Sequence, residues 1–540
     1  MKQYFGKTVS DRISIGKLKY YEKTQTLVEK RLVADVELEI ERLREAVKIS
    51  LVQLDELYQK VYLEAGEYHA SVFMGHRMIL LDEHYVGEIE HSIRQDHVNV
   101  EYAIEQLSKA WVMKFEAMET AYMRARAADI NDISQRLREN LDGEMNNESW
   151  PKEPAIIFAN DLTPSETVRM NVSNVLGFIT KHGSTYSHTS ILARTLGIPA
   201  IVDISIEAIL DGELAILDGE SGQVIVSPTK EMLEVMQTKL ELQKEEELLL
   251  KTYQKQEAIT MDGVSIQIFA NIGNIDDAME AIKNGAQGIG LFRTELLFLG
   301  RNDFPSEEEQ YLTFCSVANK MKNKKFIIRT MDIGADKQLD YLNLGNEENP
   351  ALGFRGIRIC LEYPKLLKDQ LAAGFRAAYH YPIQIMFPMI VSIREIEQIQ
   401  EIVNQVVEDL DTRNVDYKKP PLGIMIETPA AMLISDELAR KVDFFSIGTN
   451  DLMQYLNAAD RQNPRTEYLY DFKSDVFKRS IQMIVKSAKD AGIDVSICGE
   501  AAGDPELTEF FLREGIHELS VDPKRILKIV KRVREINLKS

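Results

Sequence analysis

The stretch Phe444-Phe445-Ser446-Ile447-Gly448-Thr449-Asn450-Asp451 is an example of the pattern that repeats through the second half of this chain. An apolar run of strand length ends at a glycine, and an amide and a carboxylate follow soon after it. Short apolar runs bounded by turn residues are typical of buried parallel strands. The same texture of strand, loop and helix recurs from about residue 260 to residue 540, so we expect a repeated β/α unit there.

Candidate strands recur along this half of the chain as a β/α barrel requires. They end at or cover Ala270, Leu291-Phe292, Ile327-Ile328 and residues 383–387, 423–426, 444–447, 495–497 and 517–520, with 357–359 as a further candidate. Their number is close to eight, and the span suits an eight-stranded β/α barrel of the TIM type, for which about 250 residues are typical. Such barrels carry their chemistry at the carboxyl ends of the strands.

Polar and ionisable residues follow one candidate strand after another. They are Arg293, Glu295, Arg329, Glu427, Asn450, Asp451 and Cys498, with Arg355 and Arg461 in loops. Arginine forks bind phosphate and carboxylate groups bidentately, and a pair of carboxylates suits Mg²⁺. Asparagine can donate to a phosphate oxygen, and a thiol of suitable pKa can act as a general acid. Gathered at one rim, these groups would suit an anionic substrate that bears both a phosphate and a carboxylate.

Each of these residues has a simpler interpretation when it is taken alone. Arg293 and Glu295 could form a surface ion pair, and Cys498 could be an inert buried thiol. Glu427 could cap the helix that begins near Thr428-Pro429. Their shared position after successive candidate strands favours the functional interpretation.

The segment Gly183-Ser184-Thr185-Tyr186-Ser187-His188 joins a candidate strand to a candidate helix. An apolar run at 175–179 precedes it, and an apolar helical pattern follows it and stops near Gly197. His188 would therefore lie at a helix N-terminus, where free amides and the helix dipole favour an anion. A histidine there could carry a phosphoryl group as a covalent intermediate, and the alternative is a capping or loop histidine.

The first 150 residues differ in texture from the rest, because they contain no proline and repeat apolar residues every three or four positions. That period predicts a helical bundle over about 30–142, with breaks near Gly66, Asp82 and Asn99. Short strands appear at 13–16 and again after Pro151, so the bundle is expected to be inserted into a small α/β domain. Residues 230–258 are expected to form a connecting helix.

These patterns predict a multidomain α/β chain with four parts. They are an α/β domain over 1–20 and 145–229 that contains His188, a helical domain over 21–144, a linker helix over 230–258 and a β/α barrel over 259–540.

The composition of the 540 residues, 44% hydrophobic and 28% charged, is that of an ordinary soluble protein. A net charge of −21 argues against nucleic-acid binding and is compatible with a basic protein partner. The three cysteines are far apart and form no C-x-x-C pair, so we expect neither a zinc site nor a disulfide framework. The first residues lack a signal-peptide core and no run is long enough to span a membrane, so we expect the cytoplasm and no membrane insertion.

Several motifs occur in an order that matches a known family. They are Ser187-His188-Thr189-Ser190-Ile191-Leu192-Ala193-Arg194, Gly290-Leu291-Phe292-Arg293-Thr294-Glu295, Arg329-Thr330-Met331-Asp332-Ile333-Gly334, Glu347-Glu348-Asn349-Pro350, residues 423–429, Ile447-Gly448-Thr449-Asn450-Asp451-Leu452 and Cys498-Gly499-Glu500. Over essentially its whole length the chain resembles the enzyme I family of bacterial phosphoenolpyruvate:sugar phosphotransferase systems, the phosphoenolpyruvate–protein phosphotransferases.

The resemblance implies a role for each part. His188 would carry the phosphoryl group, and Cys498 would protonate the enolate to give pyruvate. The helical domain would bind the carrier protein HPr, whose histidine receives the phosphoryl group in the first step of sugar uptake, and the barrel would form a homodimer. Phosphoenolpyruvate would be bound by Arg293, Arg329, Arg355, Asn450 and Arg461, and Mg²⁺ by Glu427 and Asp451.

The chain departs from the family in the loop before the histidine, which usually reads Gly-Gly-Arg-Thr-Ser-His. Here Ser184-Thr185-Tyr186 lacks the arginine and adds a tyrosine, which leaves the charge of the loop and the rate of transfer open. Two other functions share parts of this pattern. A pyruvate,phosphate dikinase or phosphoenolpyruvate synthase would need an ATP-binding domain, for which the sequence offers no glycine-rich nucleotide loop. A regulatory protein with an inactive barrel would not need the intact set of site residues.

Other ionisable residues of the helical part have two interpretations. His69, His76, His84 and His91 are explained by packing or by solvated faces, with contact to HPr as the alternative for His69 and His76. Arg124 and Arg126 could meet the phosphate of the partner or pair with Asp129 and Asp132.

Overall fold

The computed structural model describes residues 1–10, 12–21, 28–65, 67–117, 121–142, 151–170, 174–183, 188–195, 197–206, 210–298, 303–334, 347, 349–460 and 465–539. The chain divides into two compact units, Met1–Glu245 and Glu246–Ser540.

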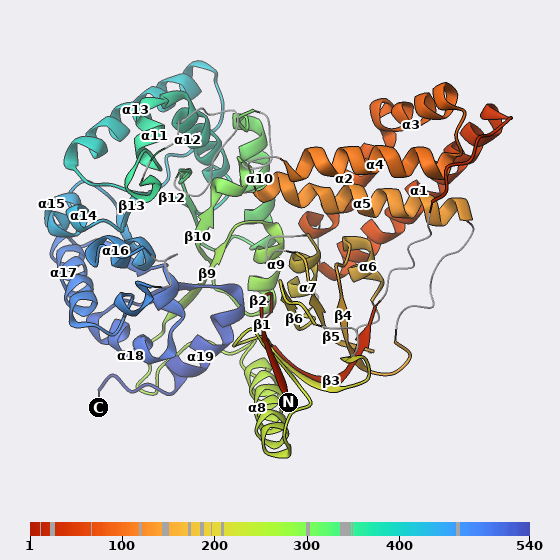
Figure 1. The fold of residues 1–540 in the computed structure, drawn as a ribbon. Coiled ribbons are helices and arrows are strands. Elements are labelled where there is room, and N and C mark those ends of the chain that lie inside the picture. Colours follow the sequence, from red (N-terminus) through yellow and green to blue (C-terminus); the bar gives the residue numbers. More distant parts are fainter. Residues whose placement is uncertain are drawn as a thin grey trace. The chain divides into compact units, whose positions relative to one another are not determined.

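Long helices form one part of the first unit (Figure 1). They are α1 (Val36–Ala65), α2 (Glu67–Leu81), α3 (Glu83–Asp96), α4 (Val100–Glu116) and α5 (Ala121–Asp142). The apolar positions of the helical period, among them Leu43, Leu54 and Ile104, are buried in one core. Asp82 ends the second helix and caps the third by accepting from the amide of His84. None of the helices in the described ranges combines the length and the apolar composition needed to span a bilayer.

A mixed sheet forms the other part of the first unit, with strand order β1-β8-β7-β3-β4-β5-β6-β2. Its strands are β1 (Lys2–Phe5), β2 (Lys7–Thr8), β3 (Ile13–Tyr20), β4 (Ala155–Ala159), β5 (Val175–Thr180), β6 (Ala200–Val202), β7 (Leu214–Asp218) and β8 (Gln223–Val226), with helices α6 (Pro164–Arg169) and α7 (His188–Thr195). Leu18 of β3 pairs in parallel with Ile156 of β4, although the whole helical bundle separates them in sequence. The predicted insertion of the bundle into an α/β domain is therefore confirmed.

Helix α8 (Lys230–Lys251) follows the sheet, and its Met232, Leu233 and Met236 pack against a small core of that sheet. The predicted helix over 230–258 is too long, because α8 ends at Lys251. The amide of Thr252 bonds to the carbonyl of Leu249 at 3.0 Å, and the next two residues make the same three-residue turn. Such tight turns satisfy the last carbonyls of a helix and stop it.

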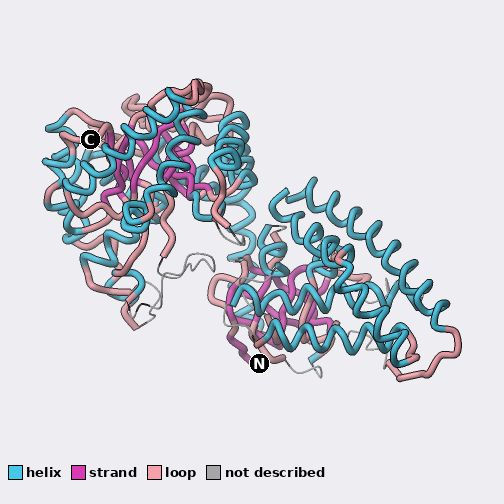
Figure 2. Tube along the Cα trace, turned by 90° about the horizontal axis from the view of Figure 1, so that it is seen from above, coloured by secondary structure: helices cyan, strands magenta, loops and turns pink. Residues whose placement is uncertain are grey.

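Eight parallel strands close into a barrel in the second unit, in the order β10-β11-β12-β13-β14-β15-β16-β9. The strands are β9 (Gln267–Ile272), β10 (Ile289–Arg293), β11 (Phe326–Arg329), β12 (Ile383–Phe387), β13 (Leu422–Ile426), β14 (Phe444–Ile447), β15 (Asp494–Ile497) and β16 (Glu518–Val521). Helices surround the strands in Figure 2. The predicted β/α barrel is confirmed.

The helices of this unit follow the strands along the chain. They are α9 (Ile275–Lys283), α10 (Glu307–Lys320), α11 (Ile357–Glu362), α12 (Pro364–Ala378), α13 (Ile393–Thr412), α14 (Pro429–Leu433), α15 (Ser435–Leu438), α16 (Thr449–Leu456), α17 (Asp475–Ala491), α18 (Pro505–Glu514) and α19 (Ile526–Arg534). The structure corrects the further strand candidate at 357–359, which is the start of α11. Gly356 has a φ of 58° and its carbonyl accepts from the amide of Cys360, which begins the helix. Three apolar residues in a row fit a helix as well as a strand.

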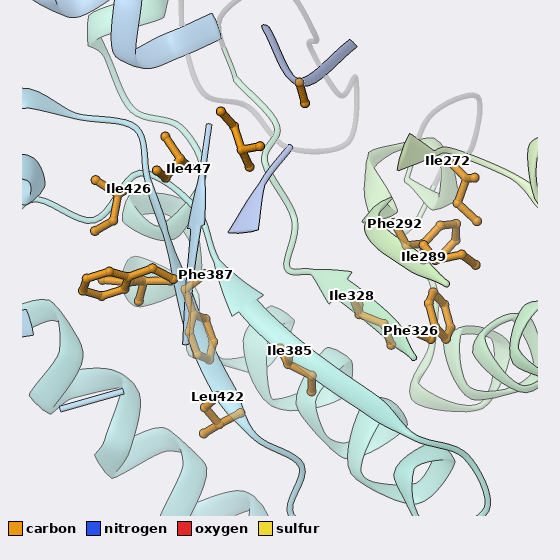
Figure 3. Packing of buried hydrophobic residues seen from close by; sticks show 14 of the residues in the cluster. Ile272, Ile289, Phe292, Phe326, Ile328, Ile385, Phe387, Leu422, Ile426 and Ile447 are labelled. Carbon is orange, nitrogen blue, oxygen red and sulfur yellow. The ribbon is translucent and has the colours of Figure 1, made fainter. Parts of the chain in front are cut away.

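Successive residues of the barrel strands point into two different cores. Phe292, Ile328 and Ile385 lie in the large core between strands and helices, where Figure 3 shows them with their neighbours. Leu291 and Ile327, each one residue earlier, lie in a smaller core with Cys498. This alternation follows from the two-residue period of a strand. It determines which residues at the strand ends can face the mouth of the barrel.

Candidate active site

A cavity of about 590 Å³ lies at the carboxyl ends of the barrel strands. The predicted site residues that line it are Arg293, Arg329, Arg355, Glu427, Asn450, Asp451 and Cys498. They come from β10, β11, the loop before α11, and the ends of β13, β14 and β15. The structure therefore brings together residues that lie far apart in the sequence.

Two predicted residues stand apart from this group. Arg461 lies outside the described residues. His188 begins α7 in the first unit, and its side chain lies outside the described side chains. Their roles stay predictions.

Arg329 is held between two carboxylates at the floor of the cavity. It is almost wholly buried, its Nη2 bonds to Glu295, and its Nη1 lies 3.1 Å from Oδ2 of Asp332. Burial alone would lower the pKa of Arg329, but the charges of Glu295 and Asp332 raise it above its ordinary value. The guanidinium is therefore a fixed positive charge aimed at the cavity.

Arg355 shares Asp332 with Arg329. Its Nη2 and Nε donate to the two oxygens of Asp332 at 2.9 and 3.2 Å, and its Nη2 also lies 3.4 Å from Oδ2 of Asp451. Its Nη1 donates to the hydroxyl of Tyr455 at 3.3 Å. Asp332 thus fixes the spacing of two arginines, as a bidentate carboxylate can.

Glu427 and Asp451 form the acidic side of the cavity. Both are buried, and Oε1 of Glu427 accepts from the amide of Met389 at 2.7 Å. Burial first, and then the charges of Asp451 and Asp332, raise the pKa of Glu427. Oδ1 of Asp451 is buried without a hydrogen-bond partner. Two neighbouring buried carboxylates of this kind are costly unless a cation compensates them.

The acidic pair fits a metal that takes few protein ligands. Among the described residues there is no group of three or more His, Cys, Asp or Glu arranged to hold an ion. Mg²⁺ commonly binds through one or two carboxylates and completes its shell with water and substrate oxygens. The unpartnered oxygen of Asp451 beside Glu427 suits such an ion better than Zn²⁺, which prefers a full set of His and Cys ligands.

Cys498 follows β15 and points its side chain into the inner core of the barrel. Its amide donates to the carbonyl of Ile447 at 3.0 Å, and its Sγ lies 3.5 Å from the same oxygen. Burial raises the pKa of the Cys498 thiol to about 11. The thiol is therefore protonated at neutral pH, which a proton donor requires.

Asn450 lies in the first turn of α16 and is locked to the segment after Cys498. Its Nδ2 donates to Glu500 at 3.0 Å, and its Oδ1 accepts from the amide of Glu500 at 2.9 Å. Asn450 also lines the cavity, so this pair fixes the amide at its rim.

Comparisons with known proteins agree with this geometry. The model of the PEP-utilising enzyme, PEP-binding domain, matches residues 247–538, the N-terminal model of the PEP-utilising enzymes matches 5–126, and the model of their mobile domain matches 151–222. The phosphoenolpyruvate-protein phosphotransferase of Geobacillus stearothermophilus is 40% identical over 533 residues, which cover 97% of this chain and 92% of the relative. That of Priestia megaterium is 37% identical over 540 residues, 99% of this chain and 94% of the relative.

The chain belongs to the phosphoenolpyruvate-protein phosphotransferase family. The resemblance seen in the motifs is thereby confirmed, as is the prediction that the chain is an enzyme of this family. The relatives and the family models support a phosphoenolpyruvate-dependent phosphotransferase.

In this member of the phosphotransferase family, the predicted strand before the histidine and the predicted helix after it are confirmed, while residues 184–187 lie outside the described residues. β5 ends at Thr180 and α7 begins at His188. The hydroxyl of Thr189 donates to the carbonyl of Leu162 at 2.7 Å, which ties the first turn of α7 to the segment before α6. That segment is fixed in turn by a capping box, in which Thr163 and Glu166 bond reciprocally.

His69 and His76 lie on α2, whereas His84 and His91 lie on α3, and Asp82 separates the two helices. His76 is fully buried, with Nε2 at 3.3 Å from Asp129 and Nδ1 at 3.9 Å from Asp132. Arg126 also pairs with Asp129 at 3.1 Å. These contacts support the packing interpretation for His76 and the pairing interpretation for Arg126, whereas the side chain of Arg124 lies outside the described side chains.

Sequence reasoning missed several groups that line or support the cavity. Asp332 stands within a recognised motif but received no role, although it pairs with both buried arginines. Tyr455 and Gln454 lie on α16, one turn beyond Asp451, and that helical spacing is a signal that could have identified them.

Proposed function

We propose that the chain transfers the phosphoryl group of phosphoenolpyruvate to its own His188 and then to a histidine of the carrier protein HPr, and that it releases pyruvate. This would be the first step of sugar uptake by the phosphotransferase system. The proposal depends on one observation above all. Three arginines, two buried carboxylates and a protonated thiol line a single cavity in the domain that matches the PEP-binding family model.

The arginines would hold the two anionic ends of phosphoenolpyruvate. Arg293, Arg329 and Arg461 with Asn450 are proposed to bind the substrate, and Arg355 is proposed to lie near the phosphoryl group. Because Arg329 and Arg355 are already fixed by Asp332, they need little reorganisation when charge shifts during the reaction. Such preorganised charge is the main contribution of a protein to phosphoryl transfer.

Glu427 and Asp451 are proposed to hold Mg²⁺. The ion would neutralise charge on the phosphoryl oxygens when it is bound. Glu427 would be presented to the ion in a fixed orientation, because its Oε1 accepts from the amide of Met389.

The chemistry balances with the groups available. A ring nitrogen of His188 attacks phosphorus, the bond from phosphorus to the enol oxygen breaks, and its electron pair stays on that oxygen as an enolate. The S–H of Cys498 then gives its proton to the terminal carbon, which forms pyruvate, and water restores the proton to the thiolate. A histidine of HPr finally attacks the phosphorus on His188 and regenerates the enzyme.

The two reacting groups belong to different units, so the proposal requires the unit that carries His188 to approach the barrel and to leave it again. Helix α8 is proposed as the lever. The proposed division remains 1–20 with 145–229, 21–144, 230–258 and 259–540, with HPr bound by the helical domain and a cytoplasmic homodimer formed through the barrel.

Pyruvate release coupled to lactate dehydrogenase tests the function. With Mg²⁺, phosphoenolpyruvate and an excess of HPr, we expect pyruvate formation until the HPr is phosphorylated, a single turnover when HPr is left out, and no pyruvate with His188→Ala. His182→Ala is the matched control, since this exposed histidine follows the same strand and should leave the rate unchanged. Pyruvate formation that needs AMP and pyrophosphate instead of HPr would support a dikinase. Binding of phosphoenolpyruvate without any pyruvate would support a regulatory protein.

A further inference from the structure

Asn271, near the end of β9, has a side chain that bonds to three groups at the ends of two other strands. Its Nδ2 donates to the carbonyl of Cys498 at 2.8 Å and to the carbonyl of Ser520 at 3.0 Å. Its Oδ1 accepts from the hydroxyl of Ser520 at 2.7 Å. The function proposed above does not use Asn271.

The carbonyl of Cys498 lies where the strand ladder ends. β15 pairs with β16 through Ile497 and Leu519, one residue before the cysteine. On the other side, the amide of Cys498 donates to Ile447 of β14. On the side of β16 no strand pair reaches Cys498, and the side-chain amide of Asn271 donates to its carbonyl instead. A buried carbonyl without such a partner would be costly.

The residues after Cys498 are packed just as closely. A Cβ atom on Gly499 would lie 1.8 Å from Oγ1 of Thr449, so this backbone lies directly on the start of α16. Two residues after the cysteine, the amide of Glu500 is held by Asn450. Asn450 thus fixes this segment from α16, and Asn271 fixes it from β9.

Ser520 completes the arrangement. Its hydroxyl orients the amide of Asn271, so that the nitrogen faces the two carbonyls. Gly290 of β10 leaves the space for it, because a Cβ there would lie 2.5 Å from Oγ of Ser520. A carboxylate in place of Asn271 would present an oxygen to both carbonyls and would repel them.

We infer that Asn271, oriented by Ser520, is a positioning residue that fixes the backbone of Cys498 and thereby aims its thiol at the substrate carbon. The inference depends on the proton-donor role proposed for Cys498. A general loss of protein stability would slow both phosphoryl transfer and protonation of the enolate. Asn271 acts on the step that protonates the enolate, and the step that moves the phosphoryl group to His188 should be spared.

A single-turnover experiment separates the two steps. An enolate that leaves without the proton of Cys498 takes a proton from water on oxygen and becomes the enol, which must still ketonise in solution before lactate dehydrogenase can reduce it. In the wild-type protein with Mg²⁺ and phosphoenolpyruvate, pyruvate should appear together with the phosphoryl group on the chain. In Asn271→Asp, phosphorylation should stay within about twofold of wild type, and pyruvate should lag behind it by about tenfold in rate.

Asn284→Asp is the matched control, since Asn284 also donates to a backbone carbonyl, but that carbonyl belongs to Pro523, which does not line the cavity as Cys498 does. It should show no lag. Ser520→Ala should show a smaller lag than Asn271→Asp, and it carries the test if the aspartate variant does not fold. The inference is overturned if Ser520→Ala and Asn271→Asp slow both steps equally or show no lag. A wild-type protein that gains no phosphoryl group would instead overturn the proposed function.

Discussion

The buried pair of Arg329 and Glu295 offers a test of how the cavity is built. Arg329 is 8% exposed and Glu295 is 1% exposed, and the guanidinium also contacts Asp332. In Arg329→Met the two carboxylates lose this positive charge while they remain buried. In Arg329→Met with Glu295→Gln, one of the two carboxylates is also neutralised.

The expected magnitudes follow from this burial. Breaking a buried ion pair on one side costs about 3–5 kcal/mol of unfolding free energy. With an unfolding entropy of about 2.1 cal/mol/K per residue, a unit of this size shifts by roughly 1.6 °C per kcal/mol, so Arg329→Met should lower the barrel transition by about 5–8 °C. The double variant should recover a large part of that loss. Substrate binding should behave differently, since losing a charge-assisted hydrogen bond costs about 1.5–3 kcal/mol and raises KM for phosphoenolpyruvate about 10- to 150-fold in both variants.

Scanning calorimetry of the full chain measures the stability, and the pyruvate assay measures KM. Both tryptophans, Trp111 and Trp150, belong to the first unit. Tryptophan fluorescence therefore follows the unfolding of that unit, and the remaining calorimetric transition is assigned to the barrel. Arg413→Met is the control, because that arginine makes exposed ion pairs worth about 0–1 kcal/mol. The reasoning is refuted if the double variant is no more stable than Arg329→Met, or if it regains the wild-type KM.

Four further predictions concern single residues that line the cavity or contact its arginines. Since burial raises the pKa of the Cys498 thiol to about 11, its alkylation in the metal-free protein should speed up about tenfold per pH unit from about pH 8 to pH 10 by peptide mass spectrometry, and a plateau near pH 9 would contradict this. Tyr455→Phe removes the hydroxyl that Arg355 contacts, so kcat/KM for phosphoenolpyruvate should fall about 5- to 30-fold. An unchanged kcat/KM would show that this hydrogen bond does not contribute to the reaction. Glu427→Gln should weaken Mn²⁺ binding, followed by electron paramagnetic resonance, at least about tenfold, whereas equal binding would exclude Glu427 as a ligand. In Asp451→Asn the same titration should give a comparable loss, and its absence would remove Asp451 from the proposed pair.

The convergence of the strand ends could be predicted from sequence because it depends on local order alone. In a parallel β/α barrel every strand runs the same way, so the residue after each strand faces the same mouth. Arg329, Glu427, Asp451 and Cys498 were placed by this rule, and the cavity contains all four.

Contacts between segments that are separated in sequence could not be predicted in the same way. Asp332 meets Arg355, and Asn271 meets Cys498, over separations of 23 and 227 residues. Such contacts depend on strand register and side-chain direction, which a local pattern does not contain. The short apolar run at 357–359 was misread for a related reason, because only its packing distinguishes a helical turn from a strand.

The central claim is that a histidine of the first unit takes a phosphoryl group from a substrate held in the barrel. Intact-mass spectrometry under non-acidic conditions, after incubation with phosphoenolpyruvate and Mg²⁺, measures this directly. The account predicts a gain of one phosphoryl group per chain, carried by the peptide that contains His188 and absent from His188→Ala. An unchanged mass in the wild-type chain, or a full gain in His188→Ala, would contradict it.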